Sequence, residues 1–447
     1  MTGFTTAHET FSLIFWLIVI LLVIFKYSGT SENSLESDKY YRWGLGLKIV
    51  GALFFNLIYL YYYGGGDTFY YYWGAGSIYN MAFKDFGAFI QLMIGERSPE
   101  LFSLFDYTTG YPTYYKDVNA FSVCRFMVPF YILGFTSFWG TTLAMNLFMF
   151  SIIWAFFKML NSLYPGNEKR FALFLFFIPS LFVWSSGILK DIWCLYSIFM
   201  LFVVAWKIQI KKEKIFRNIL LFLLWSYILI SIRPFMYYTA LTSILLWVVM
   251  NRLKKLDNSL LRVFIFPFFL LIAIGLSTLL ITKLSFIAGG KFATIDSMLE
   301  HAVIIQDDLS RDYYGENSFD IGAFEPTIGG MLSKAPQALI AGFFRPFIWE
   351  SRSALILLSG LENLFLLVSI IVLLVKTKFI WFFVKILEEP FILAAFTFCI
   401  LFGFMVGLTT ANFGALVRYK IPIIPFLGIV YSYIWGKLAE EKQTTII

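Results

Sequence analysis

The sequence predicts an all-α protein that crosses a membrane many times, and its composition and apolar periodicity lead to this prediction. Of the 447 residues, 59% are hydrophobic and only 14% are charged. A soluble domain of this length could not bury so much apolar surface. Apolar runs of about 15 to 22 residues recur from end to end, close to the length that spans a hydrocarbon core. They leave no separate soluble segment, so we treat residues 1–447 as one membrane-embedded domain.

The distribution of lysine and arginine predicts the orientation. Basic residues gather in short segments between the apolar runs, as in KIQIKKEKIFR at 207–217 and NRLKKLDNSLLR at 251–262, and we count Lys48 among them. Because basic segments next to spans stay in the cytoplasm, the N-terminus is expected in the periplasm and the C-terminus in the cytoplasm of a bacterial inner membrane. The excess of basic residues behind the net charge of +7 therefore orients the protein in the bilayer. It does not form a basic soluble face, so nucleic acid is excluded as a partner.

The spans follow in order from these two patterns, and about eleven to thirteen transmembrane helices are expected. The assigned crossings are 11–27, 46–63, 139–158, 171–186, 191–207, 218–232, 236–250, 262–283, 353–375, 391–409 and 420–436. The apolar stretch 120–135 contains Arg125 and Pro129. Counting it as a crossing would place the basic segment 207–217 outside, so we interpret it as re-entrant or interfacial.

Two long segments are then expected in the periplasm. Residues 64–138 alternate apolar and polar positions, which is typical of amphipathic helices on a membrane surface. Residues 284–352 have an acidic middle, QDDLSRDYYGENSFDIGAFEP. Connections of this length are uncommon unless they are functional.

Ionic residues collect on the predicted outer side. Asp67 follows the second span in the glycine turn GGGDTF, and Glu362 lies inside a span. The others are Arg125, Lys190, Asp191, Arg233, Arg345, Glu350, Arg418 and Lys420. Because ions in lipid cost several kcal/mol unless they are paired or hydrated, we expect these groups to share one cavity.

The residue types in this group indicate glycosyl transfer from a lipid phosphate. Lys190, Arg233, Arg345 and Arg418 are the candidate donor-binding cations, because such groups grip phosphate. Asp67 is the candidate base for an attacking hydroxyl. The supporting polar and sugar-binding candidates are Arg125, Asp191, Glu350, Glu362, Tyr71 and Trp73.

The expected partners are a polyprenyl-linked sugar donor, a glycan acceptor, the lipid bilayer and other glycan-assembly proteins. Three cysteines and two histidines, far apart in the sequence, give no metal-ligand set. We therefore expect no metal centre or cofactor, with use of a divalent cation left open.

Each candidate also has a structural interpretation. Asp67 could instead cap the helix after the glycine turn, and the sequence favours neither the base nor the cap over the other. Lys190 and Asp191 could form an ion pair with each other, and Arg233 and Arg345 could be snorkelling side chains. Glu350 could pair with Arg352, Arg125 could simply mark the interface, and the tyrosine clusters could form an aromatic belt.

The outer-loop Asp67, the amphipathic segment after it and RYKIPIIPFL at 418–427 resemble the polyprenyl-phosphate-dependent membrane glycosyltransferases of the GT-C class. The resemblance implies that Asp67 is the catalytic base and that Lys190 and Arg418 lie on the phosphate side. The span at 11–27 precedes the part that resembles this class.

PSLFVWSSGILKD at 179–191 and GGMLSKAPQALIAGFFRPFIWE at 329–350 are similar to polytopic proteins of bacterial surface-polysaccharide gene clusters. The expected function is therefore a transferase of O-antigen or capsule synthesis. A repeat-unit polymerase or ligase of the O-antigen polymerase kind is the alternative. A transporter or flippase is less favoured, because the inner halves of the spans carry almost no charge.

Overall fold

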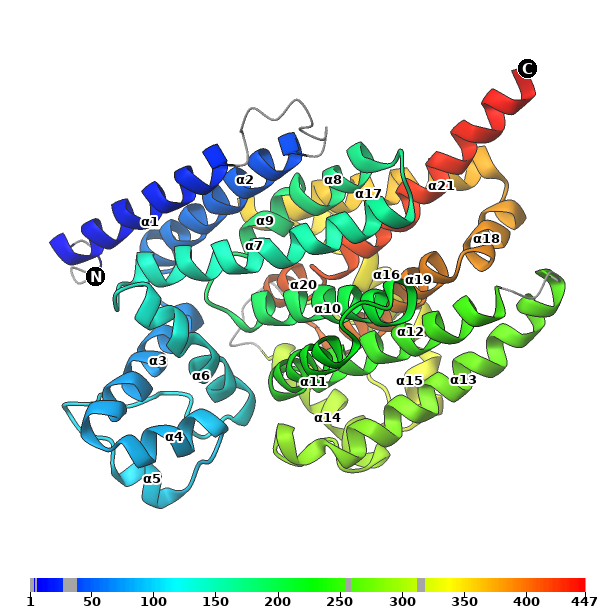
Figure 1. The fold of residues 1–447 in the computed structure, drawn as a ribbon. Coiled ribbons are helices and arrows are strands. Elements are labelled where there is room, and N and C mark those ends of the chain that lie inside the picture. The colour runs from blue at the N-terminus through cyan, green and yellow to red at the C-terminus, as the bar shows by residue number, and fades with distance from the viewer. Residues whose placement is uncertain (1–3, 5, 27–37, 255–258, 312–317, 447) are drawn as a thin grey trace. The chain divides into compact units, whose positions relative to one another are not determined.

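The computed structural model describes residues 4, 6–26, 38–254, 259–311 and 318–446, and the regular elements in these ranges are all helices (Figure 1). Within these residues the only β pairing is an isolated bridge between Ser318 and Asn412. The all-α prediction is confirmed. Parts of the predicted segments 251–262 and 284–352 lie outside the described residues.

Nine helices in the described part are long and apolar enough to cross a membrane, and a bent pair makes a tenth. The nine are α1 (Ala7–Lys26), α2 (Asp38–Leu57) with η2 (Ile58–Tyr62), α7 (Phe138–Leu163), α10 (Lys190–Trp206), α11 (Ile215–Ile232), α12 (Pro234–Leu253), α13 (Ser259–Lys283), α17 (Ala354–Thr377) and α19 (Pro390–Thr409). Each coincides with an expected crossing. The chain is therefore a multi-pass protein of a lipid bilayer.

The two remaining crossings are interrupted helices. The run at 420–436 belongs to the bent pair α20 (Phe413–Tyr419) and α21 (Ile423–Ile446), which turn by 54°. The run at 171–186 is not one continuous helix, because α8 (Glu168–Phe176) ends and α9 (Pro179–Trp184) begins anew. Pro179 has no amide hydrogen with which to continue α8.

The segment 64–138 forms α3 (Asp67–Lys84), α4 (Phe86–Ile94), α5 (Pro99–Ser103) and α6 (Val118–Leu133). The expected amphipathic pattern is clearest in α4, where Ala88 and Leu92 are buried and Ile94 is 67% exposed. Helix α6 carries Arg125 and has 16 residues, so it falls among the shorter apolar helices, below the length of the candidate spans.

The segment 284–352 contains η4 (Ser285–Ala288), α14 (Ile295–Leu309), α15 (Ile328–Ser333), α16 (Ala335–Phe344) and η6 (Ile348–Glu350). Two further elements are η3 (Lys207–Lys211), which continues α10 to the end of its candidate span, and α18 (Phe379–Glu388), which lies between α17 and α19 in the chain.

The chain packs into two compact units. Unit 1 comprises Met1–Phe157, Leu181–Met200 and Leu224–Arg233, and unit 2 comprises Lys158–Ser180, Leu201–Leu223 and Pro234–Ile447. In unit 1, α3 packs along α6, and in unit 2, α19 packs against α12, α16 and α21. The division describes packing alone, so the single membrane domain stays a prediction.

Candidate functional site

Asp67 is the first residue of α3 and is half-buried. The chain reaches it through Gly64 and Gly66, whose φ angles of 65° and 116° are accessible to glycine with little strain. Gly66 occupies the N-cap position, and the cap has no side-chain hydrogen bond. Asp67 is therefore not the capping residue, although its carboxylate lies at the positive end of α3.

Tyr114 is the direct partner of Asp67, and the sequence did not indicate it. Its hydroxyl donates to Asp67 Oδ1 over 2.5 Å. Burial, reinforced by the hydrogen bond to Asp67, raises the pKa of Tyr114. The phenol therefore keeps its proton and orients the carboxylate from one side.

Aromatic rings surround this pair, but not all of them are accessible. The Tyr70 and Tyr71 rings lie 5.9 Å and 4.9 Å from that of Tyr114. Tyr71 is only 3% exposed, whereas Tyr70 and Trp73 are 39% and 49% exposed. Stacking of a sugar on Tyr71 is therefore blocked, because its ring is covered. The accessible rings are those of Trp73 and of Tyr70, the residue next to Tyr71 on α3.

Lys190 belongs to the same unit as Asp67. Its Nζ atom lies 3.5 Å from Asp117 Oδ2. Asp117 follows Tyr114 by three residues and caps α6 by accepting from the amides of Asn119 and Ala120. One short loop thus contacts both Asp67 and Lys190. The expected pair of Lys190 with Asp191 is not observed, since adjacent helix residues point in different directions.

Asp191 pairs instead with Arg233. Asp191 Oδ1 lies 2.9 Å from Arg233 Nη2, and the two side chains are 4% and 7% exposed. Snorkelling of Arg233 is therefore wrong, because the guanidinium is buried. The pair fastens the start of α10 to the end of α11.

Arg125 is buried on α6 and binds protein groups. Its Nη1 donates to Met93 O and to Tyr227 Oη, each over 3.1 Å, and its Nη2 donates to Ser122 Oγ over 2.9 Å. Met93 O is near the carbonyl end of α4, where a positive charge is favourable. Arg125 thus joins α4, α6 and α11 and is more than a marker of the interface.

In unit 2, Arg345 and Glu350 form a close ion pair. Arg345 Nε and Nη2 lie 2.9 Å and 2.5 Å from Glu350 Oε1. The guanidinium also lies 4.3 Å from the centre of the Phe319 ring. Arg345 is therefore held by a carboxylate and an aromatic face, and it does not snorkel.

Lys420 connects this pair to the bend between α20 and α21. Its Nζ donates to Arg345 O over 2.7 Å and to Asn363 Oδ1 over 2.5 Å, and it is only 3% exposed. Asn363 in turn donates to Pro346 O. The sequence indicates Lys420 as one of the outer ionic residues without a specific role, and the signal for Asn363 is an amide within an apolar span.

Two further predicted residues lie in unit 2. Glu362, next to Asn363, accepts from the amide of Ser180 at the start of α9 over 2.8 Å. Arg418 is half-buried in the last turn of α20, two residues before Lys420. The predicted site residues therefore form two clusters, one in each unit, and a single cavity shared by both stays a prediction.

Lys48 corrects the assignment of basic segments. It lies inside a candidate span and is 4% exposed. Its Nζ donates to the carbonyl and the hydroxyl of Ser185 and lies 4.7 Å from the centre of the Tyr196 ring. Lys48 is therefore not part of a cytoplasmic loop. It fixes the turn that leads to Lys190.

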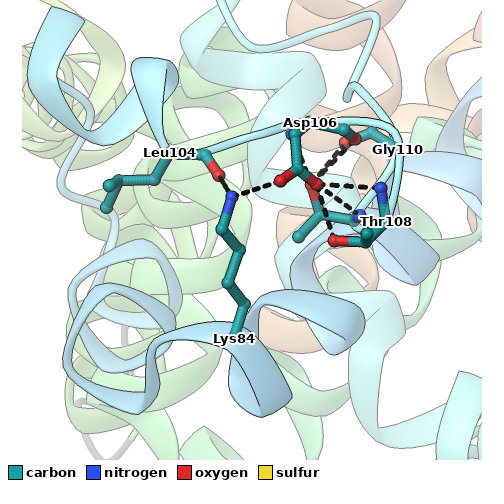
Figure 2. A network of polar contacts seen from close by, with 6 residues as sticks. Lys84, Leu104, Asp106, Thr108 and Gly110 are labelled. Carbon is teal, nitrogen blue, oxygen red and sulfur yellow. Dashed lines mark hydrogen bonds and ion pairs between the residues drawn. The ribbon is translucent and has the colours of Figure 1, made fainter.

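Figure 2 shows a polar turn at residues 104–110, which precedes Tyr114 and Asp117 in the chain. Lys84 Nζ donates to Leu104 O and to Asp106 Oδ2, each over 2.6 Å. Asp106 Oδ1 accepts from both the amide and the hydroxyl of Thr108. These donors, Lys84 first, hold the pKa of Asp106 well below its usual range.

We expect Asp106→Asn to loosen residues 104–110 at neutral pH. The carboxyl pKa is lower in the folded than in the unfolded chain, so its stabilisation is present above the unfolded value of about 3.9 and is lost as the pH falls towards the folded value. Hydrogen exchange measures the effect. Amides of 104–110 should exchange faster in the variant while those in the middle of α3 stay unchanged, and equal rates in both proteins would contradict this role.

No group of three His, Cys, Asp or Glu side chains in the described ranges is arranged to hold a metal ion. All three cysteines are buried thiols. Comparisons with family models, curated proteins and solved structures give no match. The fold thus defines a class, the α-helical multi-pass membrane proteins.

Proposed function

We propose that the protein is a glycosyltransferase of surface-polysaccharide biosynthesis. It transfers a sugar or oligosaccharide from a polyprenyl-phosphate or diphosphate donor at the periplasmic face of the bacterial inner membrane. The observation that carries the proposal is the half-buried Asp67 carboxylate, oriented by Tyr114 and linked through Asp117 to Lys190. This arrangement supports the GT-C-like assignment of Asp67.

The reaction assigns a distinct task to each group. An acceptor hydroxyl attacks the anomeric carbon of the donor and forms a new C–O bond, while its proton moves to Asp67. The bond between the anomeric carbon and the phosphate oxygen breaks, and the electron pair leaves with the phosphate. Because Tyr114 occupies Oδ1, we assign the proton to Asp67 Oδ2. Cations stabilise the charge on the departing phosphate.

Among the predicted cations, Lys190 is favoured for the phosphate. Arg233 and Arg345 each face a carboxylate at close range, which already balances much of their charge. Lys190 has only a 3.5 Å contact with a side chain that is 44% exposed, which is a weak pair. Lys190 can therefore exchange Asp117 for a phosphate at little cost.

The sugar-binding surface is assigned to the exposed rings of Tyr70 and Trp73. Their centroids are 5.9 Å apart, and they follow Asp67 at intervals of three residues along α3. Aromatic faces offer an apolar surface on which a sugar ring can stack. This surface is adjacent to the carboxylate that would receive the acceptor's proton.

A polymerase or ligase of repeat units is the second candidate. The long segment 284–352 and the arginines Arg345 and Arg418 favour it, because such an enzyme handles two lipid-linked glycans. Glycan analysis of a deletion strain separates the two. A truncated repeat unit is expected for the transferase, whereas complete single repeats without long chains would indicate the polymerase. Unchanged glycan would contradict both.

A further inference from the structure

The N-terminal helix α1 is fastened to unit 1 by buried polar contacts near its start. Glu9 accepts from Ser137 Oγ over 2.5 Å and from the amide of Phe138 over 3.0 Å. Ser12 Oγ donates to Gly134 O over 2.9 Å. Only 17% of the apolar window of α1 is buried, so these polar contacts, together with the contact between the Phe15 and Phe135 rings, hold the helix in place. The proposed reaction assigns no role to the start of α1.

A partly open pocket of about 220 Å³ lies where α1, η2 and α7 meet. Its walls are formed by Glu9, Thr10 and Leu13 of α1, by Tyr61 of η2, and by Phe4 and Trp139. The pocket is smaller than the roughly 300–1,000 Å³ of sites that enclose a drug-sized ligand. It therefore fits a short piece of a longer molecule.

The chemistry of the walls selects an apolar occupant. The Glu9 carboxylate caps α7, Thr10 Oγ1 donates to Thr6 O over 3.1 Å, and Trp139 Nε1 donates to Phe4 O over 3.1 Å. These three polar side chains are thus engaged within the protein. The ring and methyl surfaces of Phe4, Leu13 and Leu60 remain for a ligand, and the Tyr61 hydroxyl is a further polar group of the wall. Filling such a pocket with hydrocarbon is favourable, because it removes apolar area from water.

The pocket adjoins the aromatic side of α3. The Phe4 ring, one of the pocket walls, lies 5.0 Å from that of Phe69 and 6.5 Å from that of Trp73. Tyr61, on another wall, precedes Asp67 by six residues. An apolar chain in the pocket therefore has its end close to the helix that begins with the proposed base.

We propose that this pocket binds isoprene units of the polyprenyl-phosphate donor. The inference rests on the proposed function, because that reaction requires the donor's phosphate at the start of α3 and hence its first isoprene units beside it. Helix α1 then closes one side of a lipid-substrate site, and the rest of the chain extends into the bilayer. An ordinary phospholipid tail is the competing occupant.

Photocrosslinking in lipid nanodiscs tests the proposal with a polyprenyl phosphate that carries a diazirine on its first isoprene units. The unaltered protein should be labelled on peptides that contain Leu13 or Trp139. In Leu13→Trp the indole fills the pocket, and labelling should fall about tenfold. Ile14→Trp is the matched control, since Ile14 is 52% exposed and does not line the pocket. Leu13→Phe should show a smaller loss if Leu13→Trp does not fold.

Two outcomes would overturn the proposal. One is equal labelling of Leu13→Trp, Ile14→Trp and the unaltered protein. The other is labelling of the same peptides to the same extent by a diazirine-bearing phosphatidylcholine, which would assign the pocket to ordinary membrane lipid. Crosslinking needs no turnover, so it is repeated in Asp67→Asn. Retained transfer activity in that variant would contradict the proposed base while leaving the labelling result intact.

Discussion

Asp67→Asn should lower the rate of sugar transfer by a factor of ~10²–10⁴, the usual contribution of a general base. Asparagine has the same shape, and its amide oxygen can still accept the Tyr114 hydrogen bond. It cannot take the proton of the acceptor hydroxyl. Initial rates with a purified lipid-linked donor in nanodiscs measure the effect.

Asp85→Asn is the matched control for this variant. Asp85 caps α4 by accepting from the amide of Ala88, and asparagine caps helices equally well. Its transfer rate and thermal stability should match those of the unaltered protein. An Asp67→Asn protein that transfers sugar at the unaltered rate would remove Asp67 from the reaction.

Arg233→Met should lower the free energy of unfolding by about 3–5 kcal/mol, because it removes the guanidinium that faces a buried carboxylate. The double variant Asp191→Asn, Arg233→Met should regain part of this loss, since both charges then leave the interior. Denaturation in detergent micelles measures all three proteins.

Lys437→Met provides the comparison. Lys437 pairs with Glu440 at 2.8 Å, but the two side chains are 37% and 63% exposed. Such pairs contribute about 0–1 kcal/mol, so this change should be nearly neutral. Equal stability of Arg233→Met and Lys437→Met would show that the buried pair does not fasten α10 to α11.

The spans could be predicted because hydropathy is a local property. Nine of the predicted apolar runs form single helices within the described residues. The run at 171–186 is not one continuous helix, and a composition window does not register that Pro179 starts a new helix. Lys48 was misplaced for a related reason. A count of basic residues does not show how deep in the membrane each residue lies. The burial of Lys48 against Ser185 depends on which side of α2 faces the turn before α10.

The site could be predicted in its residue types but not in its partners. Asp67 and Tyr114 are 47 positions apart, and Lys190 and Asp117 are 73 apart. Hydropathy and charge patterns do not encode contacts between distant elements. The choice between Tyr70 and Tyr71 required the rotational position of α3, which depends on its packing against α6 and α4.

We propose that the clusters of both units open to the periplasm. Single cysteines at Trp73 in unit 1 and Trp349 in unit 2, which are 49% and 80% exposed, can report this. The native cysteines are buried and can be replaced by alanine. A cysteine at the exposed Lys212 marks the predicted cytoplasmic side.

The decisive measurement is labelling of these three variants by a membrane-impermeant maleimide, before and after the inner membrane is opened. We predict that positions 73 and 349 react in intact spheroplasts and that position 212 reacts only after lysis. Reaction of position 73 only after lysis would contradict a periplasmic reaction at Asp67, and reaction of 73 and 349 from opposite sides would contradict the prediction that both clusters face the periplasm.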